Sequence, residues 1–196
     1  MNAWTRSAAA VFLIACAFTT GALAQSDYPT RPIRYIVPFP PGGGTDILSR
    51  LVASKLTERL GWQIVVDNRA GAGGNIGLDA GAKATPDGYT MVTGQTSNLT
   101  INPSLYAKLP YDSLRDFIPV SVIASSPIAF MVGAKAPFKT FSEFIAAAKA
   151  KPGEITFSTT GNGTVGHLTG ELIQRTAGIK LVHVPYKGSA QAFPDL

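Results

Sequence analysis

Two glycine-rich segments lie where a predicted strand leads into a predicted helix. They run over residues 39–46, as Phe-Pro-Pro-Gly-Gly-Gly-Thr-Asp, and over residues 158–164, as Ser-Thr-Thr-Gly-Asn-Gly-Thr. Glycine lets the backbone approach a ligand closely, and Thr45 and Thr164 are good N-cap residues for the helices that follow. The free N–H groups and partial positive charge of such a helix start suit a carboxylate or a phosphate.

One such loop alone is weak support for a site, since an ordinary capped turn contains the same residues. The presence of one in each half of the chain favours two helix N-termini aimed at a shared ligand. Ligands of open α/β sheets bind at the carboxyl ends of strands, where both loops are expected. A ligand with a carboxylate at each end would suit both.

Two titratable residues are expected near these loops, and a third is expected in a strand. The charge of Asp46 favours the start of a helix, but it would repel a bound carboxylate unless it faces away or meets a ligand amine. His167 lies one turn into the helix after Thr164, where it either contacts an anionic ligand or packs on the helix. His183 lies within a predicted strand and is interpreted as structural.

The sequence offers little for catalysis or cofactor binding. Residues 71–77 read GxGxxxG, whereas the dinucleotide-binding fingerprint is GxGxxG and belongs to the first strand-to-helix turn of its unit. Because these residues follow the second strand, they are interpreted as a third wall of the same cleft or as a plain turn. A Gly-x-Ser-x-Gly elbow and a phosphate-binding Gly-Lys-Ser/Thr are both absent. One cysteine and two histidines make a metal site a poor expectation, and we expect neither a metal nor a cofactor.

Composition indicates a folded chain without a strong charge preference. Of 196 residues, 45% are hydrophobic and 15% are charged, which allows a real core and excludes disorder. The net charge of +5 is spread thinly, with no two basic residues adjacent, so it does not indicate nucleic acid or an anionic membrane as partner. The net charge indicates only a mild preference for small anionic ligands.

Residues 1–24 are predicted to be a signal peptide, and the chain is expected in the periplasm. Arg6 precedes an apolar stretch over residues 8–18, and Ala22-Leu23-Ala24 forms a cleavage site. In an alternative interpretation, Leu13-Ile14-Ala15-Cys16 is a lipobox that leaves Cys16 lipidated. Both interpretations predict export.

Strands and helices alternate along the rest of the chain, which predicts parallel α/β units. Strands are expected at residues 33–37, 64–66, 89–92, 117–124, 128–132, 155–158 and 181–184. Helices are expected at residues 46–60, at 140–151 with its cap at Ser142, and at 164–177 closed by Gly178. A short helix is expected after residues 71–77, ending near residue 83, and another is expected to begin at the last residues of the chain.

Several ordered segments resemble the Bug (TctC-like) family of periplasmic solute receptors of tripartite tricarboxylate transporters. They are residues 32–34, 37–46, 68–77, 86–90, 101–106, 161–164 and 183–188, and together they cover essentially the whole chain after the signal peptide. The resemblance implies an α/β, two-lobed, type II periplasmic-binding-protein-like fold, which closes around a small carboxylate. Residues 25–124 would form the first lobe and residues 125–196 the second. Members of this family are longer, so the chain is expected to be C-terminally truncated and its first lobe incomplete.

Carried over residue by residue, the resemblance implies a ligand site made of three groups of residues, with backbone groups and ordered water holding the ligand. One side of the ligand would meet Phe39, Gly42, Gly43, Thr45 and Asp46. The other side would meet Gly161, Asn162, Gly163, Thr164 and His167. Thr96, Ser97 and Asn98 would line the floor.

The function implied is capture of a small organic carboxylate and its delivery to the membrane subunits of a tripartite transporter, by a monomer without catalysis. Two alternatives from other classes remain open. One is an exported enzyme that uses the same cleft, and the other is a sensor component that docks on a membrane kinase.

Overall fold

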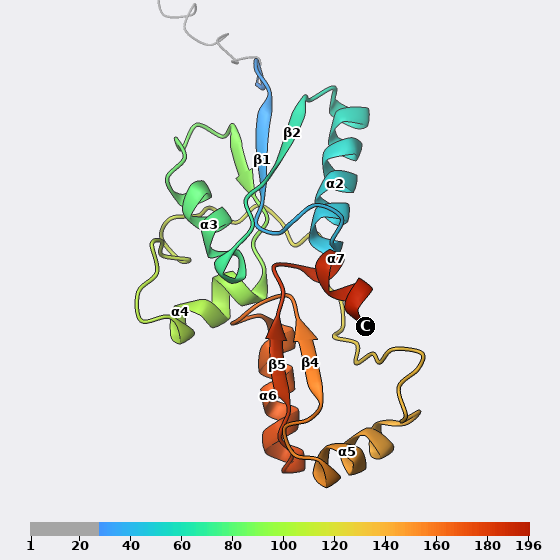
Figure 1. Ribbon diagram of the computed structural model, residues 1–196. Coiled ribbons are helices and arrows are strands. Elements are labelled where there is room, and N and C mark those ends of the chain that lie inside the picture. The colour runs from blue at the N-terminus through green and yellow to red at the C-terminus, as the bar shows by residue number, and fades with distance from the viewer. Residues whose placement is uncertain (1–27) are drawn as a thin grey trace, which may run out of the picture. The chain divides into compact units, whose positions relative to one another are not determined.

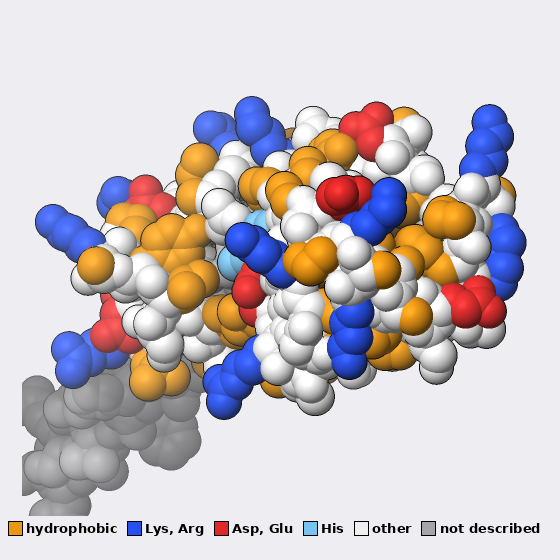
Figure 2. Space-filling view, turned by 60° about the horizontal axis from the view of Figure 1, so that its bottom comes forward, with side chains coloured by type: hydrophobic (Ala, Val, Ile, Leu, Met, Phe, Trp, Pro, Cys, Tyr) orange, Lys and Arg blue, Asp and Glu red, His pale blue; other side chains and the backbone are white. Residues whose placement is uncertain are grey.

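A computed structural model describes residues 28–196, of which Arg31–Leu196 form one compact unit (Figure 1). The predicted signal peptide, its cleavage site and Cys16 lie outside the described residues. Within the described part, no helix has the length and apolar character needed to cross a membrane. Lys and Arg side chains are scattered over the face drawn in Figure 2, as their spacing in the sequence predicts.

The first half of the unit is built around a parallel sheet in the order β2-β1-β3. Its strands are β1 (Ile33–Val37), β2 (Ile64–Asn68) and β3 (Thr90–Val92), and the helices that follow the first two strands are α2 (Gly44–Leu60) and α3 (Asn75–Ala82). The central strand is the apolar run IRYIV, and its Ile33, Ile36 and Val37 are completely buried. The predicted β-α-β-α-β order is therefore confirmed.

The second half contains a two-stranded parallel sheet with helices around it. Its elements are α5 (Phe141–Ala150), β4 (Thr156–Thr159), α6 (Val165–Ala177), β5 (Val182–Pro185), α7 (Ser189–Ala192) and the 3-10 turn η4 (Phe193–Asp195). Phe144 and Ala148 of α5 pack with Ile179 and Leu181 to form its core. In Figure 1 the strands of the two sheets point toward one another, so the loops at their carboxyl ends meet.

Two of the predicted helix caps are wrong and one is confirmed. Helix α2 is capped by Gly43 rather than Thr45, because Asp46 at its third position reaches back to the backbone of Gly42. Helix α5 is capped by Thr140 rather than Ser142, with its hydroxyl accepting from the N–H of Glu143 at 3.2 Å. The predicted cap Thr164 is confirmed, since its hydroxyl accepts from the N–H of His167.

The strands predicted at residues 117–124 and 128–132 do not form. Their apolar runs are typical of strands, but a strand exists only where a neighbour completes its hydrogen bonds. In the described part of the chain, β3 pairs only with β1 and β5 only with β4, and neither pairs with these runs. Ile118 and Val120 are accordingly 89% and 90% exposed.

Candidate functional site

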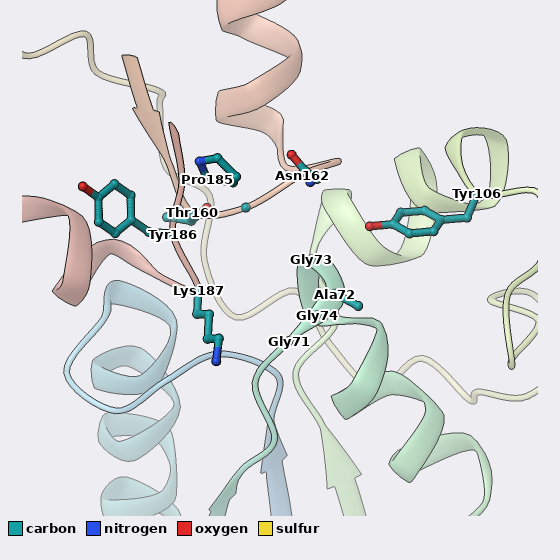
Figure 3. Close-up of a pocket in the computed structure, with 11 residues that line it drawn as sticks. Gly71, Ala72, Gly73, Gly74, Tyr106, Thr160, Asn162, Pro185, Tyr186 and Lys187 are labelled. Carbon is teal, nitrogen blue, oxygen red and sulfur yellow. The ribbon is translucent and has the colours of Figure 1, made fainter. Parts of the chain in front are cut away.

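A cavity of about 200 Å³ lies at the carboxyl ends of the strands, where loops of the two halves meet (Figure 3). Its walls come from the turn before α3, from the segment after α4 (Asn102–Leu105), and from the ends of β4 and β5. It is lined by Gly71, Ala72, Gly73, Gly74, Tyr106, Thr160, Gly161, Asn162, Pro185, Tyr186 and Lys187. Two of the predicted ligand residues, Gly161 and Asn162, are among them.

The walls approach so closely that side chains do not fit between them. A Cβ atom on Gly73, which has φ 64°, would lie 2.7 Å from the carbonyl oxygen of Asn162. A Cβ atom on Gly163, at φ 75°, would lie 2.5 Å from Oδ1 of Asn102. Both contacts are closer than real Cβ atoms allow, so glycine at position 73 lets residues 71–74 pack against Asn162, and glycine at position 163 lets the second loop pack against α4. Residues 71–74 thus lie where the interpretation as a third wall expects them.

The polar groups that line the cavity favour an anion. Lys187 is its only charged lining residue. Within residues 28–196, the side chains of Lys187, Tyr106, Thr160 and Asn162 have no hydrogen-bond or ion-pair partner. Figure 3 shows the hydroxyl group of Tyr106 directed toward Gly73. A cavity with one lysine, several uncharged donors and no carboxylate would accommodate an acid rather than an amine.

The predicted ligand residues of loop 39–46 do not line this cavity. Asp46 is only 2% exposed, and its carboxylate accepts from the N–H of Gly42 at 2.9 Å, from Nε of Arg50 at 3.0 Å and from Nδ2 of Asn68 at 2.9 Å. Burial alone would raise the pKa of Asp46, but these hydrogen bonds hold it below its ordinary value. The carboxylate therefore faces the scaffold and stays ionised there.

The other residues of that loop have partners of their own. Phe39 is buried beside Gly74, and Thr45 accepts a hydrogen bond from Nε2 of Gln95 at 2.6 Å. Gly42 and Gly43 face the first residues of α7. Loop 39–46 is thus absent from the lining of this cavity, and its predicted role as one side of the ligand site stays a prediction.

The predicted floor residues lie behind the cavity in a buried network of amides. Thr96 is exposed, whereas Ser97 and Asn98 are buried at the start of the π-helical turn η3 (Ser97–Ile101). Nδ2 of Asn98 has no partner within residues 28–196 and lies against Gly74, which lines the cavity. Asn98 is therefore the predicted floor residue with a free donor next to the wall.

Three residues that the sequence analysis missed complete this network. Oδ1 of Asn75 accepts from Nδ2 of Asn102 at 2.6 Å and lies 2.8 Å from the hydroxyl of Tyr111. That hydroxyl also lies 2.6 Å from the carbonyl oxygen of Asn98. Burial raises the pKa of Tyr111 to about 12, with a smaller contribution from Tyr106, so the phenol stays neutral. The uncharged network fixes residues 71–74 from behind.

Loop 158–164 is held from behind by its helix cap and by two histidines. The hydroxyl of Thr164 donates to the carbonyl oxygen of Gly161 at 2.8 Å, and Nδ1 of His167 accepts from the N–H of Gly163 at 3.3 Å. The ring of His167 stacks on that of His183, with centroids 4.1 Å apart. Of the two interpretations of His167, the structure has the packing contact, and the ring does not line the cavity.

His183 and Thr159 form a hydroxyl–imidazole pair that the sequence did not indicate. Nε2 of His183 lies 2.7 Å from Oγ1 of Thr159. Burial, and after it the proximity of His167, lowers the pKa of His183. Thr159 is 7% exposed and also bonds to the backbone of Gly161, so its hydroxyl supports the loop and does not line the cavity.

The lining residues missed from the sequence are Tyr106, Thr160, Pro185, Tyr186 and Lys187. Tyr106 and residues 185–187 belong to segments that carry the family resemblance, and this was the available signal. Their chemistry alone did not distinguish them from surface residues. Among the described residues, no group of three or more His, Cys, Asp or Glu could hold a metal ion.

Comparison with known proteins gives consistent matches. Residues 48–196 match the family model of TctC, described as "Tripartite tricarboxylate transporter family receptor". Protein BugT of Bordetella pertussis is 42% identical over 184 residues, which cover 93% of this chain and 56% of BugT.

Two solved structures share the fold. Rpa4515 of R. palustris with adipate has a TM-score of 0.84 and 39% identity, over 87% of this chain and 57% of that one. The periplasmic binding protein BugD has a TM-score of 0.74 and 31% identity, over 86% of this chain and 56% of BugD. The expected α/β fold of a periplasmic binding protein is confirmed, and this chain spans a little over half the length of these proteins.

Proposed function

Since this chain belongs to the tripartite tricarboxylate transporter receptor family (TctC), we propose that it is a periplasmic solute-binding protein for a small carboxylate. The observation that carries the proposal is the cavity between the two sheets, which is lined by Lys187 and free uncharged donors but by no acidic residue. The similar protein Rpa4515, solved with adipate, supports a carboxylate as the ligand class.

The size of the cavity supports a small ligand. Its volume of about 200 Å³ lies below the roughly 300–1,000 Å³ of pockets that take drug-sized molecules. A short acid can place one carboxylate near the ammonium group of Lys187. Its other end would then meet the hydroxyl of Tyr106, the amide of Asn162 and the backbone of residues 71–74.

Delivery of the acid to the membrane subunits of a tripartite transporter is the physiological role we infer. The family description supports this role, and the predicted signal peptide supports a periplasmic location. A monomer remains our prediction for the receptor. Relatives of this chain are described as receptors and binding proteins, which supports binding without catalysis.

Thermal unfolding of the purified chain with and without acids tests the proposal. A ligand at 100 times its Kd adds about 2.7 kcal/mol, which corresponds to a rise in Tm of roughly 5–11 °C. We expect adipate or another short carboxylic acid from a panel to give such a shift, and the uncharged diamide of adipate to give none. A cooperative transition that no acid moves would contradict the proposal.

A further inference from the structure

The rings of His167 and His183 lie directly behind the cavity wall formed by loop 158–164, and the proposed function uses neither. They are stacked with their planes inclined by 16°. His167 belongs to the first turn of α6 and His183 to β5, so the pair joins helix to sheet. The side chain of His167 is 20% exposed, and histidine atoms reach the surface on the face drawn in Figure 2. Solvent protons therefore have access to the pair.

Each ring is bonded to one end of the wall. Nδ1 of His167 accepts from the N–H of Gly163 at 3.3 Å. His183 bonds to Oγ1 of Thr159, and that hydroxyl in turn accepts from the N–H of Gly161 at 3.3 Å. The two histidines thus support the backbone on both sides of Asn162, which lines the cavity.

The groups that face the pair come from α6 and β4. Glu171 on α6 places Oε1 3.8 Å from Nε2 of His167. On β4, the ring of Phe157 stacks on His183 at 4.8 Å and Thr159 supplies its hydroxyl. Among residues 28–196, Glu171 is the one anionic group recorded against either ring, and His183 itself is the other titratable neighbour of His167.

The direction of the Gly163 bond sets its dependence on protons. Nδ1 accepts through a lone pair, and protonation of the ring replaces that lone pair with an N–H. Two donors would then face each other, the Nδ1–H of His167 and the N–H of Gly163, and the bond would be lost. The positive charge gained by His167 would also lie against the stacked ring of His183.

We propose that His167 is a positioning residue of the carboxylate site, which holds the wall at Gly163 while its ring is neutral and releases it when the ring is protonated. This inference rests on the proposed function, because the released wall lines the ligand cavity. Ligand affinity is therefore lost when the ring is protonated and Nδ1 no longer accepts.

The first test needs no ligand. The amide signal of Gly163 is followed by NMR from about pH 8 to about pH 5.5, the range in which histidine titrates. The wild-type chain is compared with His167→Asn, whose Oδ1 replaces Nδ1 as acceptor and does not titrate. We expect the wild-type amide to shift and lose protection from hydrogen exchange on acidification, while the amide of the variant stays constant. A wild-type Gly163 amide that does not respond overturns the inference.

The second test measures the Kd for adipate over the same pH range. Adipate gains protons over this range whichever variant is present, and this affects both Kd values equally. The informative quantity is therefore the ratio of the wild-type Kd to that of His167→Asn. We expect this ratio to rise about tenfold on acidification, as loss of one hydrogen bond implies. Glu171→Gln leaves the contact to Gly163 in place but removes the carboxylate that favours the protonated ring, so its ratio should rise less than that of the wild type over the same range. His167→Leu should bind weakly at every pH.

The outcomes separate the two proposals. A ratio that stays flat while the wild type binds adipate overturns the positioning role and leaves the proposed function standing. Failure of the wild type to bind adipate or any other short carboxylic acid at about pH 8 overturns the proposed function, and the Gly163 titration then decides the positioning role alone.

Discussion

Loop 39–46 and loop 158–164 have similar residues and similar places in the fold, but they use the helix start behind them differently. In the first, Asp46 folds back onto the N–H of Gly42, so the start of α2 already has an anion of its own. In the second, the first turn of α6 contains no acidic residue and is capped by the hydroxyl of Thr164. Because an anion neutralises the positive end of a helix, we expect the start of α6 to attract a bound acid more strongly than the start of α2.

Gly163→Ala should have the largest effect on stability. The new Cβ would meet Asn102 and Leu105 at 2.5 and 2.8 Å, at a φ of 75°. Strain and overpacking together should cost about 3 kcal/mol in the free energy of unfolding, measured with urea. The matched change in the other loop is Gly44→Ala, where no atom lies within 4 Å of the new Cβ. It should leave stability within about 1 kcal/mol of the wild type, and equal losses in both variants would contradict this difference.

Asp46→Asn should cost about 2 kcal/mol, because an amide N–H₂ would face donors from Arg50 and Asn68. Since the pKa of Asp46 is held below its usual value, its contribution is present above the unfolded-state pKa and lost as pH falls through the folded-state pKa. The wild-type advantage should therefore shrink below about pH 4. Glu154→Gln, in an exposed pair with Lys151, is the control and should change stability by less than about 1 kcal/mol.

Lys187→Gln should weaken adipate binding about tenfold, since one charge-assisted hydrogen bond is lost from a partly exposed site. Isothermal titration calorimetry measures this Kd. The exposed Lys180, which does not line the cavity, provides the control Lys180→Gln, and its Kd should match that of the wild type. If the two variants bind alike, the charge beside loop 158–164 does not recognise the ligand.

Thr164→Ala and Thr45→Ala give the smallest but most direct comparison. Thr164 caps α6 and also donates to Gly161, so its loss should cost about 1 kcal/mol. Thr45 does not cap α2 and loses only its bond to Gln95, so the cost should be about half as large. Thermal unfolding of both variants measures the difference, and the opposite order would contradict the assignment of the caps.

Hydrophobic periodicity predicted the elements that are completed by neighbours in the described chain. The run Ile33 to Val37 is almost entirely apolar because β1 is covered on both faces, and α6 closes at Gly178 with the left-handed backbone that a helix end favours. The same periodicity failed at residues 117–132. A pattern in the sequence specifies which faces are apolar, but it does not state whether a pairing strand is present.

The sequence predicted only those residues of the candidate site that have a local signal, as it did for the strands. Loop geometry identified Gly161 and Asn162, since their spacing before a capped helix is a local signal. Tyr106 and Lys187 reach the cavity only because segments far apart in the sequence meet there. Asp46 illustrates the converse: its charge was read correctly, but its partners Arg50 and Asn68 are set by the fold.

The uncharged network of Asn75, Asn102 and Tyr111 has a consequence for how the cavity responds to its surroundings. Salt screens interactions between ions, with a Debye length of about 10 Å at 0.1 M and about 3 Å at 1 M. Hydrogen bonds between neutral buried groups contain no ion to screen. We therefore expect residues 71–74 to keep the same position at low and at high salt concentration. The position of this wall should therefore depend little on salt concentration. The group of the cavity lining that salt can screen is the ammonium group of Lys187.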